Sequence, residues 1–95
     1  MLDGNKVTDD DVEKAIVEEL YDFLSDGKTT VCTLVLYNGF TVRGYSACVD
    51  PANFNEADGK KYSRERAVNE VWPALGAILA EKLYQQRASS YQGGN

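Results

Sequence analysis

The fold is decided by residues 29–49, which read TTVCTLVLYNGFTVRGYSACV. Two runs rich in β-branched and aromatic residues flank Asn38-Gly39. Asn-Gly between two such runs is the strongest short-range signal for a β-hairpin. We therefore expect antiparallel strands over residues 29–37 and 40–49, joined by a two-residue turn.

A two-residue turn sets a register in which Cys32 lies opposite Tyr45. In this register the first strand is apolar on both faces, so both need cover from helices or from a second subunit. Cys48 lies on the opposite face from Cys32, and the two cysteines therefore predict free thiols rather than a disulfide or a zinc site. Gly44 inside the second strand predicts either a bulge or the close approach of another backbone.

The segment before the hairpin predicts a helix over residues 9–25. Thr8 is a good N-cap, and Asp11 three residues later comes close to a capping box. Apolar residues then recur at helical spacing as far as Leu24. Gly27 follows with the freedom to end a helix at positive φ.

Residues 62–87 predict a second helix, which Pro73 should kink or split after Trp72. The sequence 89–95 lacks periodicity and predicts a flexible tail after a single domain over residues 1–88. The expected fold is α+β, with the order helix–β-hairpin–helix (αββα) and the hairpin packed on the helices.

The net charge of −5 is unevenly distributed along the chain. Residues 1–27 contain nine acidic and two basic residues, whereas the remainder contains six acidic and eight basic residues. A nucleic-acid-binding protein needs the reverse sign to neutralise phosphates, so we expect no direct DNA or RNA binding. An acidic segment instead favours an encounter with a basic protein surface.

The sequence offers few side chains of the kinds that usually act in catalysis. There is no histidine, which removes the commonest general base and metal ligand. The spacing of Asp50, Glu56 and Asp58 matches no calcium loop, and no glycine-rich phosphate loop is present. We expect no enzymatic activity, no cofactor and no metal. The chain shows neither a signal-peptide pattern nor an apolar run of ~20 residues, so a cytoplasmic location without membrane contact is expected.

Two surfaces are candidates for binding a partner. One is the acidic side of the first helix, for which an ordinary solvated surface is the simpler interpretation. The other is the loop after the hairpin together with a stripe on the second helix. Loop residues of this kind often serve only the loop backbone, and the tryptophan fits a core position equally well. The candidate residues are Glu18, Glu19, Asp22 and Asp26 on the first surface, and Tyr45, Asp50, Asn53, Phe54, Arg66 and Trp72 on the second.

A family resemblance is carried by five segments: NGFTV (38–42), GYSACVDPANF (44–54), Gly59, AVN (67–69) and VWP (71–73). Between about Val31 and Leu83 the chain resembles the phage gene-product forty-nine/sixty-six family of small tailed-phage and prophage proteins. The acidic first segment and the tail lie outside this resemblance. It implies a protein made inside an infected bacterium, and it implies no catalytic residues and no established activity.

Three functions compete on these observations. The first is an inhibitor that binds a host or antiviral-defence protein directly, which is an analogy with other small phage proteins. The second is a dimer that sequesters a small anionic, nucleotide-like ligand between Arg43, Arg64 or Arg66 and aromatic side chains. The third is a minor virion or assembly component, which mass spectrometry of purified particles would detect. The small size of the core favours a homodimer in each case.

Overall fold

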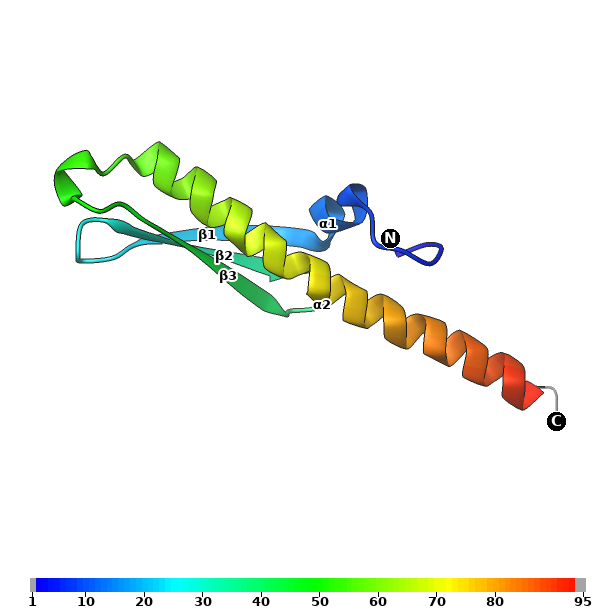
Figure 1. Cartoon of the computed structure of the whole chain (residues 1–95). Helices are drawn as coiled ribbons and strands as arrows, with labels where there is room; N and C mark the ends of the chain where they lie inside the picture. The colour runs from blue at the N-terminus through cyan, green and yellow to red at the C-terminus, as the bar shows by residue number, and fades with distance from the viewer. Residues whose placement is uncertain (1, 94–95) are drawn as a thin grey trace.

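The computed structural model describes the backbone of residues 2–93 and the side chains of residues 2–89. Its elements are α1 (Asp9–Ala15), β1 (Ile16–Phe23), β2 (Thr29–Leu36), β3 (Thr41–Ala47), the 3-10 helix η1 (Pro51–Asn53) and α2 (Glu56–Gly93). The strands form one antiparallel sheet in the order β1-β2-β3, and α2 lies across one of its faces (Figure 1). The α+β class and the packing of the hairpin on a helix are confirmed, but the sheet has a third strand.

The helix expected over residues 9–25 is wrong beyond Ala15. The capping box at its start does form, because the Thr8 hydroxyl accepts from Asp11 N at 3.1 Å and the Asp11 carboxylate accepts from Thr8 N at 2.9 Å. From Ile16 onward the chain is β1 and pairs with β2. Without β1, one edge of the apolar strand β2 would keep unpaired backbone groups. Residues 16–23 are rich in β-branched and aromatic residues and hydrogen-bond to that edge. This pairing outweighs the helical spacing of their apolar side chains.

The residues expected to end a helix form the turn between β1 and β2 instead. The Asp26 carboxylate accepts from Lys28 N at 2.9 Å, from Thr29 N at 3.0 Å and from the Thr29 hydroxyl at 2.6 Å. Gly27 adopts φ 74°. The hydrogen bond from the Thr29 hydroxyl, followed by those from the backbone, holds the pKa of Asp26 below its usual value. Glycine and aspartate serve helix ends and hairpin turns alike, so this signal was ambiguous.

The hairpin at Asn38-Gly39 is confirmed, but its two-residue turn is wrong. Gly39 N donates to Leu36 O at 2.9 Å, and Leu36 N donates to Phe40 O at 2.8 Å, so residues 37–39 form a three-residue loop. Gly39 has φ 87°, the left-handed conformation that the last position of such a loop requires.

The longer loop shifts the register between β2 and β3 by one residue. Cys32 lies opposite Gly44 rather than Tyr45, and Leu34 lies opposite Val42. A shift of one residue exchanges the two faces of a strand. Val42 therefore joins the core under α2, and Tyr45 turns to the other face.

The core lies between α2 and the sheet. Most of its fully buried members follow every second residue of β2 and every fourth residue of α2: Thr30, Cys32, Leu34 and Leu36 from the sheet, and Ser63, Ala67, Val71 and Leu75 from the helix. Val12 and Ala15 of α1 are also fully buried and belong to the same core. The helix crosses β3 at Gly44, where a Cβ atom would overlap Ala67 N and Ser63 O and would lie 2.8 Å from Arg66 C. Of the two alternatives predicted for this glycine, a bulge or the close approach of another backbone, the structure shows the second.

The helix α2 is longer than expected at both ends and is not split at Pro73. Figure 1 shows the ribbon continuing past this residue. Pro73 and Asn69, whose carbonyl it leaves without an intrahelical donor, are both exposed, so water can satisfy that carbonyl. Residues 89–93, expected as part of a tail, continue the helix, and residues 94–95 lie outside the described part.

The shape is elongated because the second half of α2 projects beyond the tip of the hairpin (Figure 1). The radius of gyration is 17.8 Å, whereas a compact domain of this length has one of roughly 12 Å. Across residues 2–93, no helix is both long enough and apolar enough to cross a membrane. Cys32 is buried, Cys48 is partly exposed, and both are free thiols as expected. The face expected for Cys48 is wrong, because the shifted register places residue 48 on the side of the sheet that Cys32 occupies.

Tyr21 lies on the α2 face of β1, opposite Cys32. Burial, followed by the influence of Cys32 and Glu19, raises the pKa of Tyr21 to about 12. The unfolded chain titrates near pH 10, so the folded chain holds this proton more tightly and its stability falls as the pH rises from about 10 to about 12. We expect Tyr21→Phe to reduce this loss of stability, measured by urea unfolding at several alkaline pH values. Tyr84→Phe at an exposed site is the matched control, and the same alkaline slope in both variants would contradict the assignment.

Candidate functional site

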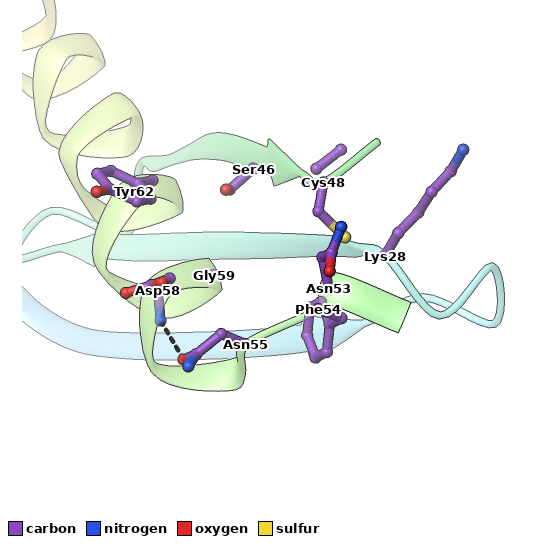
Figure 2. A pocket seen from close by; sticks show the side chains of 10 residues that line it. Lys28, Ser46, Cys48, Asn53, Phe54, Asn55, Asp58, Gly59 and Tyr62 are labelled. Carbon is purple, nitrogen blue, oxygen red and sulfur yellow. Dashed lines mark hydrogen bonds between the residues drawn. The ribbon is translucent and has the colours of Figure 1, made fainter. Parts of the chain in front are cut away.

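A cavity of about 210 Å³ lies at the end of the sheet farthest from the hairpin tip (Figure 2). The start of β2, the end of β3, the loop that contains η1 and the first turns of α2 surround it. The residues that line it are Lys28, Ser46, Ala47, Cys48, Asn53, Phe54, Asn55, Asp58, Gly59 and Tyr62. We refer to it as the loop pocket.

Short-range hydrogen bonds hold the loop that forms one wall of the loop pocket. The Asp50 carboxylate accepts from Ala52 N at 3.0 Å, and Asp50 O accepts from Asn53 N at 2.9 Å. Cys48 N donates to Lys28 O at 3.0 Å, which ties the end of β3 to the start of β2. Asp50 thus orders the loop, while Asn53 lines the pocket.

The opposite wall is the N-terminal end of α2, which begins at Glu56. The Asn55 side chain caps this end, because its Oδ1 accepts from Asp58 N at 3.0 Å (Figure 2). Gly59 lets the helix approach β2, since a Cβ atom here would overlap the Thr30 hydroxyl. That hydroxyl is buried and has no hydrogen-bond partner among the residues that the structure describes.

An aromatic cluster supports the pocket from β1. The rings of Phe54 and Phe23 meet edge to face with their centroids 5.9 Å apart. The Lys60 ammonium lies 5.5 Å from the ring centroid of Tyr21 and 5.9 Å from that of Phe23. Contacts of this kind fix aromatic side chains in place. Phe54 therefore lines the loop pocket and also packs against Phe23 of β1.

The four acidic candidates do not form one surface. Glu19 is bound to Arg64, which also lies 3.1 Å from a Glu13 oxygen. Asp26 belongs to the β1–β2 turn. Only Glu18 and Asp22 are exposed on the sheet face turned away from α2 and make no hydrogen bond or ion pair among the described residues.

The remaining candidates lie outside the loop pocket. Tyr45 is exposed on the sheet face turned away from α2, and its carbonyl accepts from Arg66 Nη1 at 2.6 Å. Trp72 is half-buried and packs against the core. Of the loop candidates, the structure brings only Asn53 and Phe54 to the pocket.

The three arginines expected to hold an anion are also dispersed. Arg64 is engaged by carboxylates, and the hydrogen bond to Glu19, followed by that to Glu13, raises its pKa above the ordinary value. Arg66 serves the Tyr45 carbonyl, and Arg43 lies on the sheet face away from α2. Lys28 is the basic residue of the loop pocket instead.

Sequence reasoning missed Lys28, Ser46 and Tyr62 as lining residues. Lys28 reaches the pocket only because β1 is a strand, whose turn then lies beside the η1 loop (Figure 1). Ser46 faces α2 only in the shifted register. Tyr62 was expected to begin the second helix, whereas α2 starts earlier, at Glu56, and so carries Tyr62 past the end of the loop.

The lining combines hydrogen-bonding groups of several kinds. An ammonium, a carboxylate, two amides and two hydroxyls lie among the side chains around the cavity. Tyr62 is 44% exposed, so part of its side chain is accessible to solvent and to a ligand. Such a set can orient a polar ligand through directed hydrogen bonds and one aromatic contact.

Comparison with curated proteins and with solved structures finds no match. A protein family does match, over residues 7–83, and its description is "Phage protein (N4 Gp49/phage Sf6 gene 66) family". The match extends beyond the resembling segment 31–83 to residues 7–30, and it covers most of the chain. The chain therefore belongs to the N4 Gp49/phage Sf6 gene 66 family of phage proteins.

Proposed function

We propose that this phage protein is a non-enzymatic binding protein that captures a small polar, nucleotide-like ligand in the loop pocket. The observation that carries the proposal is that Asn53, Asn55 and Tyr62 line one cavity from the η1 loop and from α2. Lys28 of the β1–β2 turn lies at the rim of this cavity, with its side chain extending away from the others (Figure 2). An ammonium suits a negatively charged group, amides suit the edge of a base or a sugar hydroxyl, and an aromatic ring suits a base.

The size of the cavity restricts the ligand. Its volume of about 210 Å³ is below the range of roughly 300–1,000 Å³ typical of pockets that enclose drug-sized molecules. The ligand is therefore small, or only one end of it is enclosed. Capture without turnover agrees with the absence of histidine from the sequence.

The test is calorimetric titration of the purified protein with a panel of nucleotides, together with analysis of small molecules released on heat denaturation. We expect one class of nucleotide to bind, and Asn53→Ala to weaken its binding by about tenfold through loss of one or two hydrogen bonds. Asn69→Ala, an exposed asparagine of α2 outside the pocket, is the matched control. No heat from any nucleotide and no released molecule would overturn the proposal.

A second candidate function is inhibition of a host or antiviral-defence protein by direct binding. The specific observation is that β1 is an edge strand carrying free Glu18 and Asp22 beside exposed Leu20. Such an edge can pair with a strand of a partner. Affinity capture from infected cells tests it. A captured partner whose affinity is unchanged after reversal of both carboxylates would exclude this segment as the contact.

A further inference from the structure

The sheet face turned away from α2, here called the open face, has no helix over it in the part of the chain that the structure describes (Figure 1). Its central residues Val31 and Thr33 are only 9% and 7% exposed, whereas the residues of its outer strands are more exposed. Strand pairing places on it Glu18, Leu20 and Asp22 from β1, Val31 from β2, and Arg43 and Tyr45 from β3. Leu20 and Tyr45 are 45% and 57% exposed. Large apolar side chains left in water on one sheet face are typical of a face that another layer covers.

The charges of the open face lie on its two outer strands. Glu18 and Asp22 flank Leu20 along β1. Arg43 lies on β3 at the same level, because Leu20 and Arg43 both pair with Thr33 of β2. None of the three charged residues forms an ion pair within residues 2–89. The two outer strands are roughly 10 Å apart, and among the described residues no ion pair joins either carboxylate to the guanidinium within one copy.

We propose that a second copy of this chain covers the open face, related by a two-fold axis parallel to β2. Rotation about that axis places β3 of the partner over β1. Because Leu20 and Arg43 share one level, the partner's Arg43 then lies between Glu18 and Asp22. The same contact recurs on the other side of the axis, as a closed two-fold interface requires. Sheets packed face to face lie about 10 Å apart, a distance that an arginine and a carboxylate side chain span together.

The charges also select this axis over the alternative one. The alternative two-fold axis lies in the plane of the interface and runs perpendicular to the strands. It places β1 of one copy on β1 of the other, so that Glu18 of one copy meets the partner's Asp22. Like charges face to face disfavour that arrangement. The axis parallel to β2 pairs opposite charges and places Leu20 and Tyr45 inside the contact.

This interface is separate from ligand capture, because the loop pocket lies under α2 on the other side of the sheet. Loss of the dimer therefore leaves the loop pocket intact, and loss of ligand binding leaves the open face intact. The two proposals fail independently.

Sedimentation equilibrium of the full chain tests the dimer. The wild-type protein should show about twice the chain mass of 10.5 kDa. Arg43→Glu alone and Glu18→Lys/Asp22→Lys alone should each weaken the dimer at least about tenfold, because each places like charges in contact. An equimolar mixture of the two variants should restore dimers, since every contact then pairs opposite charges.

Arg87→Glu and Glu65→Lys, at exposed positions of α2, are the matched controls and should leave the dimer unchanged. Dimers can be restored in the mixture only if both variants are folded. If Arg43→Glu does not fold, the milder Arg43→Gln should still weaken the dimer. Three results would overturn the proposal: a monomeric wild-type protein at every concentration, a dimer that Arg43→Gln and Arg43→Glu both leave unweakened, or folded variants whose mixture stays monomeric.

Discussion

Replacing Gly44 by alanine is expected to lower the free energy of unfolding by at least about 3 kcal/mol. The new Cβ atom would overlap backbone atoms of Ala67 and Ser63, which cannot rotate away as the end of a side chain can. The helix α2 would have to lift from β3, and its buried apolar residues would separate from the sheet. A domain of this size has a total stability of roughly 5–15 kcal/mol, so the loss is a large part of it.

Urea unfolding followed by the fluorescence of Trp72, the single tryptophan, measures this loss. The matched control is Gly76→Ala in α2, where an added Cβ atom meets nothing within 4 Å. Alanine is a better helix former than glycine, so this control should gain roughly 0.5–1 kcal/mol. Equal stability of both variants would show that α2 does not cross β3 at this point.

The sequence limited Gly44 to two alternatives, a bulge or a close backbone approach, because a glycine inside a strand has few other physical reasons. The register around it failed, because Asn38-Gly39 is compatible with loops of two and of three residues. The difference is one residue, yet it decides whether Val42 or Thr41 faces the core. Local sequence identified the hairpin, and only the packing against α2 selects the register.

The larger error of the sequence prediction was to miss the third strand, and the cause is a contact between segments that are far apart in the sequence. Residues 16–23 carry apolar side chains at helical spacing, and Ile16, Tyr21 and Phe23 also suit a strand. The choice depends on the free edge of β2, which no local window contains. The same pairing carries Lys28 to the η1 loop and so builds one side of the loop pocket. Asn53 and Phe54 were found because their loop is local in sequence, whereas the pocket as a whole depends on the sheet.

The projecting shape of the molecule divides α2 into a buried half and a free half with different energetics. Ser63, Ala67, Val71 and Leu75 recur at four-residue steps and are fully buried against the sheet. Leu79 continues this row at 4% exposure and Leu83 still packs against the core, and beyond them the helix projects past the sheet (Figure 1). A helix without an apolar partner gains little stability from its own hydrogen bonds. The first half of α2 therefore holds the fold, and substitutions along the helix should differ accordingly.

Leu75→Ala should show this difference most clearly. Leu75 is fully buried in the row that α2 packs against the sheet, and Leu79 at 4% exposure is the last buried residue of that row. Removing its side chain leaves a cavity between α2 and the sheet, and such changes cost about 2–5 kcal/mol. Tyr84→Ala in the projecting half, where the ring is 56% exposed, should change stability by no more than about 0.5 kcal/mol.

Urea unfolding of both variants, monitored by circular dichroism at one protein concentration, checks the contrast. Keeping the concentration fixed matters because dimerisation through the open face would add to the apparent stability. Equal losses from the two substitutions would mean that the projecting half of α2 is buried in the assembled protein, against a surface that the single chain does not supply. A large loss from Leu75→Ala alone would locate the stabilising contacts of α2 over β2 and β3, where the helix also forms one wall of the loop pocket.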